Sequence, residues 1–354
     1  MEAPLKEPEI LPKASTDTIR VGLVGYGYWG PNLARNFEEC EGTRLASVCD
    51  RRPERLRAAA RRYPGAKLTS NPEALLRASE VDAVAIATPV STHYELALRA
   101  LRAGKHVLLE KPLALSSEQG ERLVEEAERQ KRVLMVDHTF VYSGAVRRIR
   151  DLVASGVFGR IYYYDSVRIN LGLFQSDVNV LWDLAVHDLA IMDYVLGKEA
   201  RRLSALAVSH FEDRPENTAY LTLAFDDNLI AHIHANWLAP VKLRRTVIGG
   251  SQKMAVYDDL EPSDKVKLYD RGVEMTAGDA DLHQRLVSYR TGDMYSPKLD
   301  TTEALQVEVA HFAHCIRTGS PPLTDGRAGL RVVRLLEAAG RSIREGGRLV
   351  ELSA

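Results

Sequence analysis

The chain has 354 residues, of which 45% are hydrophobic, 27% charged and 7% aromatic. This is the composition of an ordinary globular protein, and it excludes collagen-like, coiled-coil and largely disordered chains. The 47 basic and 48 acidic residues leave a net charge of −1, so no sequence-wide positive field exists to attract nucleic acid.

Three cysteines, Cys40, Cys49 and Cys315, stand far apart and form no paired motif. This spacing argues against a disulfide framework and a structural zinc site, and it fits a reducing cytoplasm. No stretch approaches the roughly 18 uncharged apolar residues that span a bilayer. We therefore expect a cytoplasmic protein without a metal site, a nucleic-acid partner or a membrane partner.

The first 17 residues carry mixed charge and three prolines, and we expect a loose tail rather than a signal peptide. Short apolar runs then alternate with helical patterns up to about residue 138. The expected strands are Ile19–Val24, Arg44–Cys49, Ala83–Ala87, His106–Leu109 and Val133–Val136, and the expected helices are Pro31–Cys40, Pro53–Tyr63, one opening at Asn71-Pro72, Ser91–Ala103 and Ser116–Gln130. Nearly continuous apolar strands are typical of a parallel sheet. Residues 18–138 therefore read as a doubly wound α/β domain.

The pattern changes after Asp137, and we assign residues 139–354 to a second, α+β domain. Its expected strands are Ile161–Ile169, Arg202–His210, Ala219–Phe225, Leu229–Trp237, Lys242–Ile248 and Met254–Tyr257, and its expected helices are Tyr142–Ala154, Leu184–Leu196, Thr302–Arg317 and Gly326–Glu345. Turn residues between consecutive strands favour antiparallel pairing. We expect a large, mostly antiparallel sheet with one helical and one open face, and C-terminal helices able to pack back on the first domain.

A glycine-rich turn follows the first strand directly. Gly25-Tyr26-Gly27-Tyr28-Trp29-Gly30 is a G-x-G-x-x-G motif that runs into a helix, the context in which this pattern indicates dinucleotide binding. The first glycine allows the tight turn, the second lets the backbone approach a pyrophosphate, and the third lets the helix pack close to the strand. We assign Gly25, Gly27, Tyr28, Trp29 and Gly30 to a cofactor site.

The second strand ends in Asp50, 20 residues after the last glycine of the motif. This is the expected offset for a carboxylate that binds the adenosine ribose. The same charge would repel a 2′-phosphate by roughly 1–4 kcal/mol at ~4 Å, which favours NAD over NADP. Arg51 and Arg52 follow at once, and an arginine there can hold that phosphate, so NADP is the less favoured alternative.

Further motifs accompany the glycine turn. They are Ala87-Thr88-Pro89 at a strand end, His93 four residues later, Gly104-Lys105-His106-Val107 before Glu110-Lys111-Pro112, and Asp183 four residues before His187. Together with the opening Val-Gly-Leu-Val-Gly-Tyr-Gly-Tyr-Trp-Gly-Pro-Asn segment, they resemble the Gfo/Idh/MocA family of NAD(P)-dependent sugar and inositol dehydrogenases. The resemblance extends from Ile19 to about Leu349.

The resemblance implies a Rossmann domain and a C-terminal domain with an open-faced sheet. It also implies homodimers or homotetramers built through that sheet, and oxidation or reduction of a carbinol without a metal. The Tyr-Trp-Gly-Pro-Asn version of the turn resembles members that act on nucleotide-linked sugars in polysaccharide or glycoside biosynthesis. Some of those oxidise C3 of a UDP-linked N-acetylhexosamine or of its uronate.

Hydride removal from a sugar carbinol requires that the hydroxyl proton leave as well. Taking water, ~15.7, as a stand-in for the hydroxyl group, its pKa lies roughly 9 units above that of histidine. Proton loss must therefore accompany hydride departure, and a fixed positive charge should stabilise the developing alkoxide. Lys111 suits this role at the carboxyl end of its strand, where open α/β sheets bind ligands. Glu110 beside it is expected to orient it at the cofactor site.

His187 is the expected base in oxidation and the expected acid in reduction. Asp183 precedes it by four residues, which places both on one face of a helix. Asp183 then either holds the imidazole or a substrate hydroxyl, or caps this helix. Asp188 faces elsewhere on the helix, and we expect it to be solvated or structural.

The remaining candidates lie after other strands. Thr88 and Pro89 are expected to form a wall beside the nicotinamide or its ribose, and His93 either bonds the cofactor or lies on a helix surface. The candidates for substrate contact are His138 and Tyr142, which follow the strand Val133–Val136, and Arg168 and Asn170, which close the next one and could meet a uronate or a phosphate.

The sequence leaves four functions open, the last of which is cleavage of a glycoside through transient use of bound NAD, without net redox change. The first is NAD-dependent hydride transfer at a ring carbinol of a nucleotide-linked sugar, and the second is the same chemistry on inositol or a free hexose. The third is a non-catalytic regulator that senses NAD on the same fold, which should lack either the lysine or the base, whereas this chain keeps both.

Overall fold

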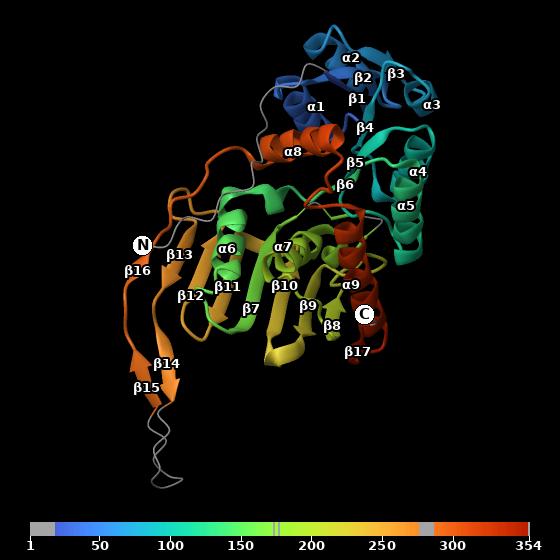
Figure 1. Cartoon of the computed structure of the whole chain (residues 1–354). Coiled ribbons are helices and arrows are strands. Elements are labelled where there is room, and N and C mark those ends of the chain that lie inside the picture. Colours follow the sequence, from blue (N-terminus) through green and yellow to red (C-terminus); the bar gives the residue numbers. More distant parts are fainter. Residues whose placement is uncertain (1–17, 173, 176–177, 276–286, 353–354) are drawn as a thin grey trace. The chain divides into compact units, whose positions relative to one another are not determined.

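The computed structural model describes residues 18–172, 174–175, 178–275 and 287–352 (Figure 1). The chain divides into two compact units. Unit 1 comprises Met1–Ser143 and Thr302–Arg334, and unit 2 comprises Gly144–Thr301 and Leu335–Ala354.

Unit 1 is built on a six-stranded, fully parallel sheet in the order β3-β2-β1-β4-β5-β6. The strands are β1 (Ile19–Val24), β2 (Thr43–Cys49), β3 (Lys67–Thr69), β4 (Ala83–Ile86), β5 (His106–Glu110) and β6 (Leu134–Asp137). The connecting helices are α1 (Gly30–Glu39), α2 (Pro53–Arg62), α3 (Pro72–Leu76), η1 (Val90–Thr92), α4 (His93–Arg102), α5 (Ser117–Gln130) and η2 (Thr139–Tyr142). This order confirms the predicted doubly wound domain, in which only the three-residue β3 was not expected from the sequence.

Local signals explain where several of these helices begin. Pro53 and Pro72 stand in the first turns of α2 and α3, where a missing N–H costs nothing. The Asn71 side chain accepts a hydrogen bond from Glu73 N at 3.0 Å, and the Ser116 hydroxyl caps α5 through Gln119 N at 3.2 Å. These caps satisfy N–H groups that the helices themselves leave unpaired.

The chain returns to unit 1 through α8 (Ala304–Thr318) and the first turns of α9 (Gly326–Arg344). The Phe312 ring of α8 meets the Phe37 ring of α1 edge-on, with centroids 6.3 Å apart. Thr324 donates from its hydroxyl to Val136 O at 2.7 Å, and its own carbonyl accepts from Val136 N at 2.8 Å. The returning segment therefore completes the core and edge of the parallel sheet.

Unit 2 contains a nine-stranded mixed sheet in the order β16-β13-β12-β11-β7-β10-β9-β8-β17. Its strands are β7 (Ile161–Leu171), β8 (Arg202–Val208), β9 (Thr218–Ala224), β10 (Ile230–Asn236), β11 (Leu238–Gly250), β12 (Met254–Asp258), β13 (Val266–Tyr269), β16 (Met294–Tyr295) and β17 (Val350–Glu351). All pairs are antiparallel except β10 with β7. The large, mostly antiparallel sheet is as predicted, but pairing of consecutive strands is wrong at β10 and β11, because β7 lies between them.

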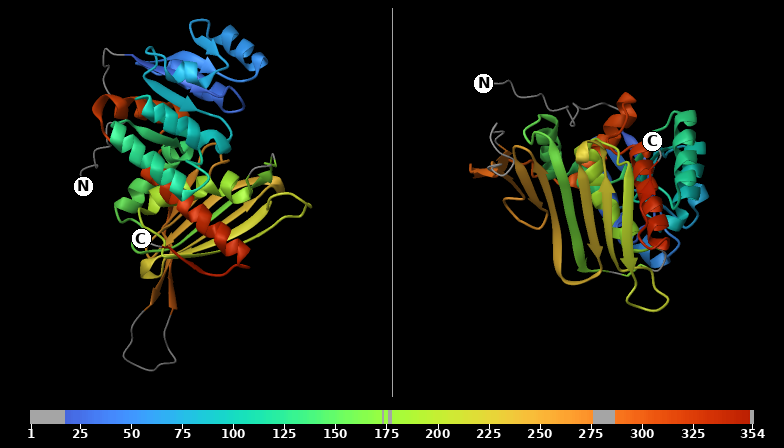
Figure 2. Two further views of the ribbon diagram at one scale, coloured as in Figure 1. Left: turned by 90° about the vertical axis from the view of Figure 1, so that its right-hand side faces the viewer. Right: turned by 90° about the horizontal axis from the view of Figure 1, so that it is seen from below.

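Helices cover one face of this sheet. They are α6 (Gly144–Ala154), the single π-helical turn η3 (Leu181–Ala185) and α7 (Val186–Leu196), and α6 and α7 lie together on the same side (Figure 2). A short turn, η4 (Asp226–Asn228), joins β9 to β10. No helix in the described part of unit 2 lies on the opposite face (Figure 2).

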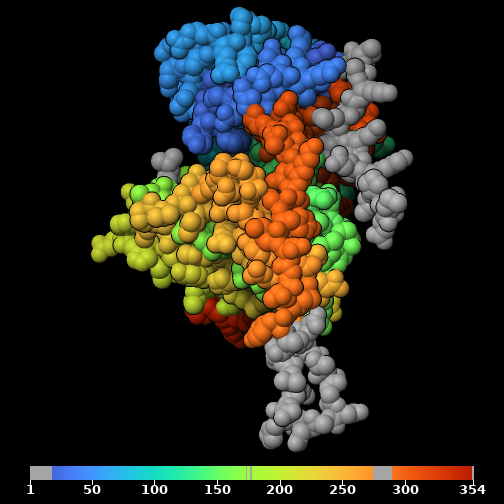
Figure 3. Space-filling view, turned by 90° about the vertical axis from the view of Figure 1, so that its left-hand side faces the viewer, coloured from blue at the N-terminus to red at the C-terminus, as the bar shows by residue number. Residues whose placement is uncertain are grey.

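β16 is the edge strand on one side of this sheet, and β13 lies next to it (Figure 3). The chain between them forms the two-stranded ribbon of β14 (Gly272–Met275) and β15 (Val287–Arg290). None of the described helices combines the length and the apolar character that a bilayer-spanning segment needs.

Candidate functional site

The glycine turn between β1 and α1 has the geometry that a bound pyrophosphate requires. Gly25 has φ +97°, and a Cβ there would lie 2.4 Å from Ala87 O. A Cβ on Gly30 would lie 2.1 Å from Gly25 O, whereas one on Gly27 would meet only Arg52 Nη2 at 3.4 Å. The first and third glycines are thus required by packing, and the second leaves its backbone open to a ligand. No side chain caps the start of α1, so the turn fits a dinucleotide phosphate at a helix N-terminus.

Asp50 lies directly after β2 and is only 7% exposed. Its carboxylate accepts from Tyr26 N at 2.8 Å and from Arg52 N, Nε and Nη2 at 2.9–3.0 Å. Burial raises the pKa of this carboxyl, but the hydrogen bonds from Arg52 and Tyr26 outweigh it, and the pKa is lowered. Asp50 therefore stands as an anion locked to Arg52 beside the glycine turn, while Arg51 is exposed.

His93 joins the loops after β4 and β5. It is 1% exposed, its Nδ1 lies 2.8 Å from Pro112 O, and its Nε2 lies 2.9 Å from Thr88 O. Burial and the charge of Lys111 lower the pKa of His93, although the two carbonyls favour the charged ring. The expectation of a helix-surface histidine is therefore wrong, because its ring is engaged by two backbone carbonyls.

The contacts of His93 hold the loops that follow β4 and β5 next to each other. Because β1, β4 and β5 are neighbours in a parallel sheet, their carboxyl ends bring the glycine turn, Thr88-Pro89 and Glu110-Lys111 to one edge. Thr88 donates or accepts a hydroxyl hydrogen bond with Thr92 at 2.7 Å. Pro89 is exposed and Lys111 is partly buried. Tyr28 is 86% exposed on the same turn.

The candidates that follow β6 are deeply buried. His138 is 3% exposed, and loss of hydration, with the nearby charge of Lys111, lowers its pKa to about 3. Tyr142 is fully buried, and its hydroxyl lies 3.0 Å from the hydroxyl of Thr324. Tyr142 thus packs in the core of unit 1, and we leave it out of the substrate contacts proposed below.

In unit 2, Asp183 lies within the π-helical turn η3, and His187 lies in the first turn of α7. The expectation that Asp183 caps this helix is wrong. Asn179 has that role, since its Oδ1 accepts from Leu181 N at 3.1 Å and from Trp182 N at 3.3 Å. Asp183 Oδ2 instead accepts from the indole Nε1 of the fully buried Trp237 at 3.0 Å. Both Asp183 and His187 are partly exposed.

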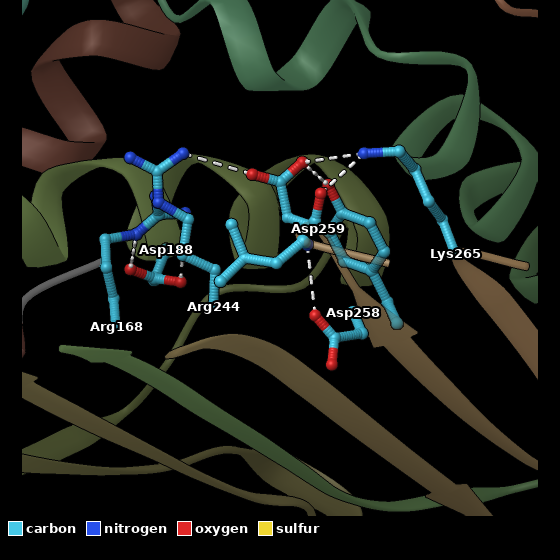
Figure 4. Close-up of polar contacts among 8 residues, drawn as sticks. Arg168, Asp188, Arg244, Asp258, Asp259 and Lys265 are labelled. Carbon is cyan, nitrogen blue, oxygen red and sulfur yellow. Dashed lines mark hydrogen bonds and ion pairs between the residues drawn. The ribbon is translucent and has the colours of Figure 1, made fainter. Parts of the chain in front are cut away.

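The buried face of the sheet carries ion pairs (Figure 4). Arg168 is 3% exposed, and its Nε donates to Asp188 Oδ2 at 2.6 Å. Asp188 is 2% exposed, so it is structural rather than solvated. The Arg168 guanidinium forms its ion pair with Asp188 in the interior of unit 2 rather than with a ligand. Arg244 similarly donates to Asp259 at 3.1 Å. Asn170, near the end of β7, stays partly exposed.

Sequence analysis assigned no role to Asn179 or to Glu308, and it did not predict the contact of Trp237 with Asp183. Trp237 contacts Asp183 across 54 positions of the chain, and Asn179 precedes the expected helix start. Glu308 of α8 is fully buried near the residues that end β5 and β6. Only Asn179 carried a local signal, because Asn is a favoured cap.

Comparisons with known proteins point both parts of the chain to one family. A family model described as "Oxidoreductase family, NAD-binding Rossmann fold" matches residues 19–138, and one described as "GFO/IDH/MocA C-terminal domain" matches residues 146–256. Among curated relatives, UDP-N-acetylglucosamine 3-dehydrogenase of Acidithiobacillus ferrooxidans is 29% identical over 89% of this chain and 94% of its own length. Myo-inositol 2-dehydrogenase of Thermotoga maritima is 24% identical over 92% of this chain and 97% of its own.

Solved structures agree with the sequence relatives. The structure of the Acidithiobacillus ferrooxidans enzyme superposes with a TM-score of 0.76 at 27% identity, covering 93% of this chain and 98% of that one. GenD2 from gentamicin A biosynthesis, solved in complex with NAD, superposes with a TM-score of 0.81 at 25% identity, covering 97% and 99%. The similarity therefore extends over both units.

Proposed function

The chain belongs to the Gfo/Idh/MocA family of NAD-binding sugar oxidoreductases, and from this premise we propose that it transfers hydride between NAD and a ring carbinol of a nucleotide-linked sugar. The carbon we propose is C3 of a UDP-linked amino sugar or uronate, in polysaccharide or glycoside biosynthesis. The observation that carries the proposal is the placement of Lys111 at the carboxyl end of β5, beside the end of β4 and the glycine turn. Similarity to a UDP-sugar dehydrogenase along nearly the whole chain supports the substrate class.

In this proposal the residues of unit 1 hold the cofactor. The glycine turn and the start of α1 receive the pyrophosphate, Asp50 faces the adenosine ribose, and the loop held by His93 borders the nicotinamide. Bound NAD supplies the hydride acceptor in oxidation, and its reduced form supplies the donor in reduction. The ammonium group of Lys111 stabilises the negative charge that develops on the substrate oxygen.

We assign the proton transfer to unit 2. His187 takes the hydroxyl proton as hydride leaves, and returns it in the reverse direction. Asp183 orients the imidazole or a neighbouring hydroxyl, and the Trp237 indole fixes the Asp183 carboxylate from the buried side. His138 and Asn170 remain proposed substrate contacts.

A second candidate function is the dehydrogenation of inositol or a free hexose. It would use the same lysine and base, and the similarity to a myo-inositol 2-dehydrogenase favours it. A non-catalytic regulator is not retained, because the family relatives are dehydrogenases and both proposed reacting residues are present.

A substrate panel separates the two candidates. With NAD, a UDP-linked amino sugar or uronate should show a KM at least about tenfold lower than the same sugar without the nucleotide, which corresponds to about 1.4 kcal/mol of binding free energy. Reduction of NAD is followed by absorbance, with myo-inositol and glucose as free-sugar controls. Equal or better kinetics with a free sugar or inositol would replace the nucleotide-sugar proposal with the second candidate.

The roles of Lys111 and His187 predict a loss of turnover. Lys111→Ala and His187→Ala should each lower kcat by roughly 10²–10⁴-fold, because each removes a group that acts in the transition state. The affinity of His187→Ala for NAD, measured by fluorescence, should stay near that of the wild type. Lys105→Ala is the control, since Lys105, at the amino end of β5, donates to the Ala78 and Val81 carbonyls before β4 and should affect thermal stability more than kcat. Normal turnover of His187→Ala would refute its role as the base.

The Asp50–Arg52 pair predicts the cofactor preference. Asp50→Ala removes the repulsion of a 2′-phosphate and releases Arg52 to bind it, so the preference for NAD over NADP should fall by about tenfold or more. Asp82→Ala is matched to it, because Asp82 forms a similar pair with Arg20 at the amino ends of β1 and β4, away from the ligand edge. The ratio of kcat/KM for the two coenzymes is measured, and an unchanged ratio in Asp50→Ala contradicts this assignment.

We also propose that the open face of the sheet joins copies of this chain into a dimer or tetramer. Leu206, Tyr220 and His234 are neighbours across β8, β9 and β10, and Leu206 is 58% and Tyr220 45% exposed. The Tyr220 and His234 rings stack with centroids 4.4 Å apart. Val208, Ile230 and Leu243 are further exposed apolar residues on this face. A contiguous apolar patch of this kind is typical of a protein interface.

This interface predicts the mass in solution. The wild type should elute with a light-scattering mass that is two or four times 39.4 kDa, and Tyr220→Lys should shift it toward the monomer, because a charge would be buried in the interface. Leu260→Lys, at an exposed position in the loop after β12, is the control. A monomeric wild type excludes the proposed assembly.

A further inference from the structure

Three carboxyl groups meet behind the proposed catalytic lysine. Glu110 and Asp137 are register partners at the ends of β5 and β6, and Glu308 approaches them from α8. Asp137 is 2% exposed and Glu308 is fully buried. Ionised carboxylates that are packed together away from water repel one another strongly. Three charges cannot coexist here without protons or a cation.

The donors around the cluster are distributed unequally. Asp137 Oδ2 accepts from the indole Nε1 of Trp29 at 2.8 Å, and Asp137 Oδ1 accepts from the Thr139 hydroxyl. Neither oxygen of the Glu308 carboxyl has an N–H or O–H donor of this kind, although both are buried. Burial of a carboxyl group that lacks donors favours its protonated form, and Asp137 lies near enough to Glu308 to act as an acceptor.

The protonation of the two glutamates follows the same pattern. Loss of hydration, the charge of Asp137 and a shared hydrogen bond with it raise the pKa of Glu308 well above its ordinary value. Loss of hydration and the charge of Asp137 also raise the pKa of Glu110, while the charge of Lys111 opposes this. A side-chain hydrogen bond with Asp137 contributes to the pKa shift of each glutamate, so a protonated Glu110 and a protonated Glu308 have Asp137 as a shared acceptor beside Trp29 and Thr139.

The surroundings of the cluster tie it to the site. Lys111 at the end of β5 interacts with Glu110, and Tyr142 of η2 interacts with Glu308. His138, just before η2, interacts with Lys111, and His311 of α8 packs against the Tyr142 ring. Both ring nitrogens of His138 are buried and have no hydrogen-bond partner within the described part of the chain, and the charge of Lys111 acts on this ring. In the described residues, no group of His, Cys, Asp or Glu side chains is arranged to hold a metal ion.

We propose that Glu110, Asp137 and Glu308 form a carboxyl cluster that holds two protons and one negative charge, and that this charge fixes the Lys111 ammonium for the reaction. The cluster is a positioning group, because it acts through Lys111 and touches neither substrate nor cofactor. Through the Trp29 indole it also connects the lysine to the glycine turn. The positioning role rests on the function proposed above, whereas the proton count does not.

Infrared spectroscopy of the purified protein tests the proton count without substrate. At pH 7 the wild type should show the C=O band of protonated carboxylic acids, and E308Q should lose part of it. E126Q is the matched control, because Glu126 is a buried carboxylate paired with Arg129 at 2.6 Å and its lowered pKa keeps it ionised. E126Q should leave the band unchanged. Absence of the band in the wild type, or an unchanged band in E308Q, overturns the proposal.

The pH dependence of turnover tests the positioning role. D137N removes the negative charge but keeps the side-chain size, so the Lys111 ammonium loses its counter-charge. The pH at which kcat falls on the alkaline side should then decrease by about one unit, which is a tenfold change in proton concentration. E126Q should keep the wild-type profile. A D137N profile that matches E126Q overturns the positioning role.

The two experiments distinguish failure of the positioning role from failure of the proposed function. If thermal unfolding shows that D137N does not fold, W29F replaces it. Loss of the indole donor to Asp137 should move the pH profile in the same direction by a smaller amount. An unchanged profile overturns the positioning role. If neither the wild type nor any variant turns over a sugar, the proposed function fails, but the infrared result still decides the proton count.

Discussion

Parallel pairing of β1, β4, β5 and β6 is the constraint on which the candidate site depends. Since all these strands run in one direction, the glycine turn, Thr88-Pro89, Glu110-Lys111 and Asp137-His138 come together at one edge although they lie far apart in sequence. Hydrogen bonding then fixes the loops at this edge. His93 holds the β4 and β5 loops together through two carbonyls, and Trp29 holds the glycine turn to the end of β6.

Several carboxylates of this protein are balanced by an arginine that forms an ion pair with them. Asp50 is neutralised by Arg52, Asp188 by Arg168 and Asp259 by Arg244. Each pair removes a charge that could otherwise not be buried at tolerable cost. Glu110, Asp137 and Glu308 differ from these pairs, because the cationic Lys111 lies at one end of the group and protons must balance the rest. This electrostatic difference is the basis on which we propose that they position Lys111.

Sequence patterns predicted the fold class and most element positions, since apolar runs, Pro at helix starts and the glycine motif are local signals. They did not predict the strand order in unit 2, because the insertion of β7 between β10 and β11 depends on long-range pairing that the hydrophobic pattern does not encode. The cofactor turn and Asp50 were found from spacing. The partners of Asp183 and Asp137 were not, because Trp237 and Glu308 reach them only through the tertiary fold.

Unit 1 is discontinuous in the sequence. The ring of Phe312, the Thr324 link to Val136 and the bridge between Met135 and Asp325 all come from a segment that starts about 160 residues after the sixth strand ends. During synthesis, the nucleotide-binding half therefore stays incomplete until the ribosome has made nearly the entire polypeptide. Loss of residues 302–334 would consequently damage the N-terminal half, and a fragment ending at residue 143 would expose the apolar surface that Phe312 covers.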